Sequence, residues 1–199
     1  STLQQFQQNI RMNPTWHKTQ VLEDMLLQQY EITINRNTEL AASAQLRSLV
    51  ENYAKRLSGL TVNSFFQHGD FCINNLLFSM GSAQIIDWDE FGHTAMPMHD
   101  EICLALSFHV IEGGEGLSGL SEHMRLVMES SYWRNQLPQQ AFAPLFVFHL
   151  LYRLGEWGNN PNRAGICQWL QVILEEFSVD PDPLFSNVRV SKQSIQTAA

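Results

Sequence analysis

The sequence predicts an α+β fold that is mainly helical, with a small β insert near the middle of the chain. Apolar residues recur at helical spacing in the first third and again after Pro97. Between these parts, short β-type runs alternate with polar turns. We therefore expect one unit over residues 1–185, with a helical arm at 1–60 and the β insert at 61–90, followed by a polar tail at 186–199.

The helical arm is expected to contain two helices. Residues 16–32, "WHKTQVLEDMLLQQYEI", place apolar side chains at helical spacing, and Pro14 suits the entrance of a helix. Residues 39–57 have one apolar face, with Thr38 as a candidate N-cap and Gly59 at the end.

In the β insert, the strand candidates are "SFFQ", "NLLFS" and "AQIIDW". Four apolar or amphipathic segments after Pro97 predict helices: 100–110, 118–133, 139–157 and 162–177. Gly114 to Gly119 match the pattern G-x-G-x-x-G of phosphate-binding loops. A predicted helix rather than a strand precedes them, so we expect an interhelical turn.

Composition restricts the possible partners. The formal net charge is −8, the pI is near 5.3 and Lys and Arg do not cluster. This argues against a nucleic-acid or anionic membrane surface and is compatible with a neutral or cationic small molecule. Three widely spaced cysteines suit reduced thiols in a cytoplasmic protein. No apolar run approaches the ~18 residues of a membrane helix.

The β insert contains a pattern that predicts phosphoryl transfer. His68, Asp70 and Asn75 fit H-x-D-x-x-x-x-N, and Asp87 ends the next predicted apolar strand. A carboxylate at Asp70 can accept the proton of an attacking hydroxyl, while the oxygens of Asn75 and Asp87 are ligands that Mg²⁺ prefers. The alternative is that Asp70 and Asp87 simply cap turns.

The segment "HGDFCINNLLF…QIIDWDEFGHTAMPMHDEICLAL" resembles the aminoglycoside phosphotransferase and choline kinase-like family. The resemblance implies that Asp70 is the catalytic base and that Asn75 and Asp87 bind Mg²⁺. It also places His68 with Asn75 and Asp87 in the ATP cofactor site, where we expect His68 to hydrogen-bond the loop backbone. Cys72-Ile73-Asn74 replaces the usual His-Pro-Gly, which puts the substrate in doubt more than the metal.

The same resemblance implies the C-terminal lobe of a protein-kinase-like fold, with catalytic and metal-binding loops in the β insert. We expect the N-terminal nucleotide lobe to be absent, and the isolated chain to be inactive for that reason. Asp100 corresponds to the acidic residue that opens the next helix, where helix capping is the alternative role. Asp100, Glu156 and Trp157 are the candidate substrate-binding residues, with Trp157 available for a cation–π contact.

Two functions remain open at this stage. One is an ATP-dependent transfer of the γ-phosphate to a hydroxyl of an amino sugar, amino alcohol or sugar. The other is a catalytically inactive kinase-like module that serves binding or regulation. The acidic helices after Pro97 favour a cationic substrate, unless those carboxylates are a solvated surface.

Overall fold

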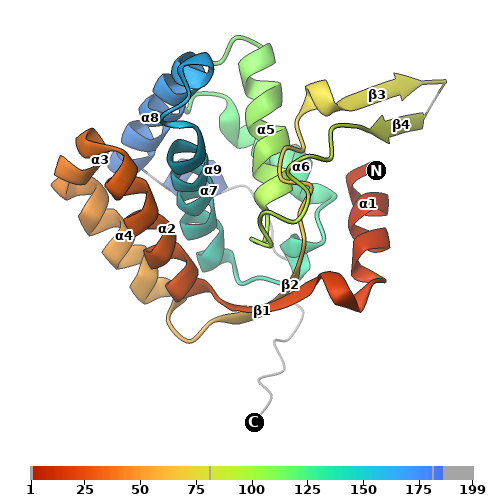
Figure 1. The fold of residues 1–199 in the computed structure, drawn as a ribbon, viewed down its shortest axis with the longest axis horizontal. Helices are drawn as coiled ribbons and strands as arrows, with labels where there is room; N and C mark the ends of the chain where they lie inside the picture. The colour runs from red at the N-terminus through yellow and green to blue at the C-terminus, as the bar shows by residue number, and fades with distance from the viewer. Residues whose placement is uncertain (1, 81, 181, 186–199) are drawn as a thin grey trace.

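The computed structural model describes residues 2–80, 82–180 and 182–185, so the tail expected at 186–199 lies outside the described residues. The α-helices are α1 (Thr2–Arg11), α2 (Leu22–Arg36), α3 (Thr38–Ala42), α4 (Ala44–Leu57), α5 (His99–Ile111), α6 (Leu120–Glu129), α7 (Phe142–Trp157), α8 (Ala164–Val179) and α9 (Asp182–Phe185). The strands are β1 (His17–Val21), β2 (Thr61–Phe65), β3 (Leu76–Ser79) and β4 (Ser82–Ile85). Figure 1 shows their arrangement.

The α+β, mainly helical prediction is confirmed, but the start of the arm differs from expectation. Residues His17–Val21 form β1, and the helix begins only at Leu22. β1 pairs antiparallel with β2, from His17 opposite Phe65 to Val21 opposite Thr61. The apolar residues that predicted a helix lie at and after Val21. The polar residues 17–20 before it contain no apolar pattern that could distinguish a helix from a strand.

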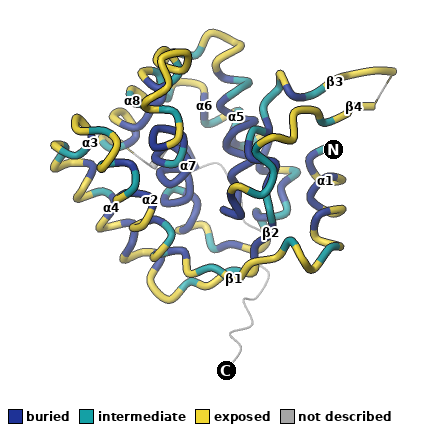
Figure 2. The backbone as a smooth tube through the Cα atoms, in the orientation of Figure 1, coloured by how far each residue is buried: buried dark blue, intermediate teal, exposed yellow. Residues whose placement is uncertain are grey.

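The β segments form two separate ribbons rather than one small sheet. β3 and β4 make an antiparallel hairpin, from Leu76 opposite Ile85 to Ser79 opposite Ser82. This hairpin projects from the body beside α1 (Figure 1). Its side chains are largely exposed, in contrast to the helical body (Figure 2).

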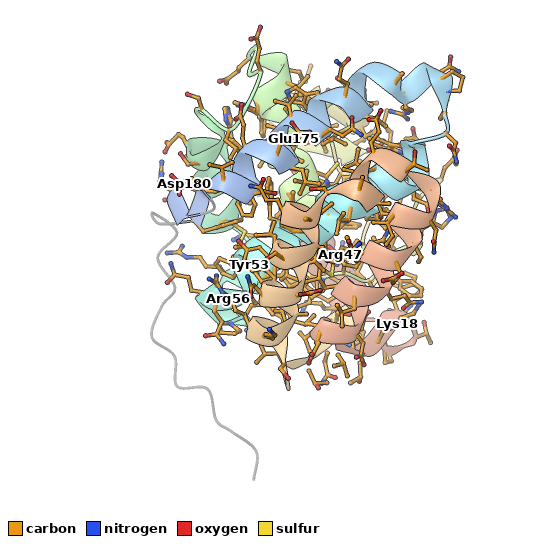
Figure 3. The ribbon with its side chains drawn as sticks, turned by 90° about the vertical axis from the view of Figure 1, so that its left-hand side faces the viewer. Lys18, Arg47, Tyr53, Arg56, Glu175 and Asp180 are labelled. Carbon is orange, nitrogen blue, oxygen red and sulfur yellow. The ribbon has the colours of Figure 1, made fainter. Side chains whose placement is uncertain are left out.

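Helix α7 is the centre of the helical body. It is apolar on nearly every face and packs against α2, α4, α5 and α8. Such a sequence is stable as a helix only when other elements cover it all round. Figure 2 shows α7 as buried along most of its length. On the side away from the hairpin, Tyr53 of α4 packs edge-on against Phe177 of α8, with ring centroids 6.5 Å apart (Figure 3).

The turn at Gly114 to Gly119 connects α5 to α6, as expected for an interhelical segment. No helix within the described part of the chain is both long and apolar enough to cross a membrane.

The contact between α2 and α7 is close at one point. The hydroxyl of Thr33 donates to the carbonyl of Leu151 at 2.8 Å. A Cβ atom on Gly155 would lie 3.0 Å from that hydroxyl. A large side chain at Gly155 therefore has no space unless the two helices separate.

We expect Gly155→Leu to lower the free energy of unfolding by about 1–3 kcal/mol, because it overpacks this contact. Gly165→Ala on α8 is the matched control. No atom lies within 4 Å of its added Cβ, so it should raise stability by about 0.4–1 kcal/mol. Urea denaturation measures both. Equal stability of Gly155→Leu and wild type would contradict the close packing.

Candidate functional site

A cavity of about 360 Å³ brings together the ends of the β insert and the helical body. Asp70, Asn75 and Asp87 line it, together with side chains from α5, α7 and α8. Asp70 and Asn75 lie in the loop after β2, and Asp87 follows β4. The structure thus places in one cavity three oxygen-bearing side chains from two loops of the chain.

Asn75 is oriented by Asp70. Its side-chain nitrogen donates to the backbone oxygen of Asp70 at 2.8 Å and to Oδ2 at 3.1 Å. The amide oxygen is therefore the atom of Asn75 left to contact a cation. The backbone carbonyl of Asn75 accepts from the N–H of Ile86 at 3.0 Å, which joins the two loops at the base of the hairpin.

Asp87 is exposed and has a left-handed backbone conformation, with φ of +58°. Asp and Asn tolerate this conformation better than most residues do. Its carboxylate and the Asn75 amide both belong to residues that line the cavity, and oxygen ligands of this kind suit a hard cation such as Mg²⁺, which keeps several waters. Among the described residues, no three His, Cys, Asp or Glu side chains cluster as a closed metal site.

Arg153 of α7 is buried beneath the loop that carries Asp70. Its guanidinium lies 3.3 Å from Oδ1 of Asp70 and 2.7 Å from Oε2 of Glu90, and it also donates to the carbonyl of Gly69. Only 2% of the Arg153 side chain is exposed, against 20% for Asp70 and 27% for Glu90. One cation therefore fixes two acidic groups and one backbone turn.

Asp100 hydrogen-bonds the backbone of the same loop and does not line the cavity. It is fully buried, and its two oxygens accept the backbone N–H groups of His68 (2.8 Å) and Gly69 (3.0 Å). Burial raises the pKa of Asp100 to about 7, although the two hydrogen bonds favour the ionised form. With both oxygens used by the loop, Asp100 is withdrawn from the candidate substrate contacts.

His68 is fully buried and does not line the cavity. Its Nε2 lies 3.2 Å from the carbonyl of Ile86 and must donate to it, because a carbonyl can only accept. Burial lowers the pKa of the imidazole. His68 thus ties the loop of Asp70 to the segment of Asp87 and does not face the cavity, where we expected it to be part of a cofactor site.

Trp157 lines the cavity, whereas Glu156 does not. Arg153 and Arg163 lie 4.4 Å and 4.6 Å from the centroid of the Trp157 ring, so two cations already occupy the positions expected for a bound amine. Glu156 instead forms an ion pair with Arg36 at 3.2 Å. The structure brings only Trp157 of the three candidate substrate residues into the cavity.

Three site residues escaped the sequence prediction. Arg153 and His149 lie four residues apart in the mostly apolar helix α7, and both are buried. Two polar residues at that spacing in an apolar helix are a signal that could have identified them. His99, at the start of α5, hydrogen-bonds both to His149 and to the loop.

Comparison with known proteins covers the part of the site that lies in the first 122 residues. A family model described as the phosphotransferase enzyme family matches residues 1–122 of the 199. This segment includes Asp70, Asn75, Asp87 and Asp100, whereas α7 and α8 lie beyond it. No curated protein and no solved structure matches the chain.

We expect Arg153→Met to lower the free energy of unfolding by about 2–3 kcal/mol. That is below the ~3–5 kcal/mol of a fully buried pair, because water partly screens Asp70 and Glu90. The control is Arg163→Met at the exposed rim, which should change stability by no more than ~0.5 kcal/mol. Urea denaturation would contradict the proposed anchoring if both variants had the same stability.

The buried imidazoles predict an acid-sensitive contribution to stability. Burial lowers the pKa of His149 well below its ordinary 6.5, so only the unfolded chain takes up this proton near that pH. The contribution of the neutral, buried imidazoles to the free energy of unfolding is present above pH 6.5 and is lost as the pH falls below that value. Asp100 acts in the opposite sense: its contribution is present below pH 3.8 and lost as the pH rises through about 7.

His149→Phe separates the two effects, because it removes one imidazole and keeps Asp100. Below pH 6.5 the wild type should lose stability more steeply than the variant, by up to about 1.4 kcal/mol per pH unit. Denaturation curves between pH 5 and 8 measure the difference. Parallel curves would show that His149 is protonated equally in the folded and unfolded states.

Proposed function

The chain belongs to the phosphotransferase enzyme family, and from this premise we propose that it transfers the γ-phosphate of ATP to a hydroxyl of a small molecule. The observation that carries the proposal is that Asp70, Asn75 and Asp87 line one cavity. Phosphoryl transfer depends mainly on positioning and charge neutralisation, which such a set of oxygens can support.

Asp70 is the proposed general base. It is partly exposed to the cavity, and Asn75 and Arg153 hold its two carboxylate oxygens in a fixed orientation. A hydroxyl bound beside Asp70 can therefore release its proton to a carboxylate that needs no rearrangement. The loop anchors on His68, Gly69 and Asp100 keep the base at this position.

Asn75 and Asp87 are the residues that would hold Mg²⁺ through their oxygens. When bound, the ion supplies positive charge that neutralises phosphate oxygens. Asn75 contributes a neutral ligand whose orientation Asp70 sets, and Asp87 contributes the negative charge. His68 and the Ile86 backbone keep the two ligand-bearing segments together.

An inactive binding module is the second candidate, and one contact favours it. Arg153 already pairs with Oδ1 of Asp70, so a guanidinium occupies one of the two oxygens of the proposed base. Oδ2, which contacts Asn75, remains for proton transfer in an enzyme. Turnover decides between the two candidates.

Asp70→Asn should lower turnover by about 10²–10⁴-fold, because it removes the base and keeps the shape of the side chain. Mg²⁺·ATP binding should change little. Product formation with a panel of hydroxyl compounds measures the first effect, and calorimetric titration with a non-hydrolysable ATP analogue measures the second. Wild-type turnover in this variant would remove Asp70 from the mechanism.

Asp87→Asn should weaken Mg²⁺-dependent nucleotide binding by about 10–100-fold, since it removes a charged contact but suits the left-handed backbone. Asp89→Asn is the matched control, because Asp89 is exposed two residues later and does not line the cavity. Equal Mg²⁺·nucleotide affinity of the Asp87 variant and wild type would show that Asp87 only shapes the turn.

A further inference from the structure

The cavity has a large apolar surface in addition to the polar groups around Asp70. Much of its wall is formed by apolar side chains of α5 and α8: Leu106, Val110, Ile111, Ile166, Trp169 and Leu170. Its carboxylates are those of Asp70 and Asp87. The guanidinium groups of Arg153 and Arg163 lie against the ring of Trp157, and their positive charge disfavours a cationic ligand beside that ring.

His149 also lines the cavity, and it is linked to the catalytic loop through His99. Nδ1 of His149 lies 3.2 Å from Nδ1 of His99, and Nε2 of His99 lies 3.0 Å from the carbonyl of Gly69. These two contacts determine where the protons are, because a carbonyl can only accept and a neutral imidazole carries a single N–H.

Nε2 of His99 must donate to Gly69. Nδ1 of His99 is then the unprotonated nitrogen and accepts the N–H from Nδ1 of His149. Burial lowers the pKa of both imidazoles well below the ordinary value, and the charge of Arg153 acts in the same direction, so both are neutral. Nε2 of His149 is therefore left with a lone pair and no proton.

This nitrogen is available to a ligand. It hydrogen-bonds no other described residue, yet it is not one of the sealed unpartnered atoms, such as Nδ1 of His68. A hydrogen-bond donor in the cavity would satisfy it. A ligand without such a donor would leave a nearly buried acceptor unpaired, which costs binding energy.

We propose that the substrate is an uncharged alcohol with an apolar body and a second hydrogen-bond donor, which His149 recognises through Nε2. The reacting hydroxyl lies at Asp70, the apolar body lies against α5 and α8, and the second donor points to α7. The inference rests on the proposed phosphotransferase function. It replaces the cationic substrate expected from the acidic helices, because those carboxylates do not line the cavity.

Three matched probes test the recognition: 1,4-bis(hydroxymethyl)cyclohexane, its mono-methyl ether and the analogue in which an ammonium replaces one hydroxyl. Dissociation constants come from ligand-observed NMR titrations of the whole chain. Wild type should bind the diol about three- to tenfold more tightly than the ether, and the ammonium compound least. In His149→Phe the diol and the ether should bind equally.

His109→Phe is the control, since His109 is buried but does not line the cavity. It should keep the preference for the diol. Persistence of the preference in His149→Phe, its absence in wild type, or tightest binding of the ammonium compound would overturn the proposal.

A long-range ¹H–¹⁵N spectrum of the wild type tests the proton positions even if His149→Phe does not fold. The expected tautomers are Nδ1–H for His149 and Nε2–H for His99; Nε2–H on His149 would overturn the proposal. Phosphorylation with Mg²⁺·ATP is measured separately. Histidine-dependent binding without phosphorylation counts against the proposed function alone, and phosphorylation without dependence on His149 counts against this inference alone.

Discussion

The buried guanidinium of Arg153 is the interaction on which the site depends. It joins the central helix α7 to Gly69, Asp70 and Glu90, three groups from two loops. A buried cation must be paired, so the loops cannot move away without leaving its charge unsatisfied. The position of the proposed base therefore depends on the packing of α7, a helix that lies much later in the chain than the strand β2 that precedes Asp70.

Gly69 lies where this support meets the backbone. Its φ is +93°, and a Cβ atom there would lie 2.5 Å from the carbonyl of Glu90. Its N–H donates to Asp100, and its carbonyl accepts from both Arg153 and His99. Only a residue without a side chain allows α5 and α7 to hold this peptide while the backbone of Glu90 lies so close to it.

The sequence was informative where the pattern is local. The helices after Pro97 and the spacing of Asp70, Asn75 and Asp87 could be predicted, because each depends on neighbours in the chain. β1 could not be, since its pairing with β2 links residues about 44 positions apart, such as Thr19 and Asn63. The ion pair of Glu156 could not be predicted either, because its partner Arg36 is 120 positions away. Nor could the sequence predict that the Asp100 carboxylate binds the backbone of the loop at His68.

The β3–β4 hairpin begins directly after Asn75 and ends two residues before Asp87. Leu76 pairs with Ile85 at its base, so the separation of the two proposed ligands is determined there and not at the tip. The hairpin could therefore gain or lose a whole number of residue pairs during evolution and leave the ligand spacing unchanged. An unpaired insertion in one strand would instead shift the register and turn one ligand to the opposite face.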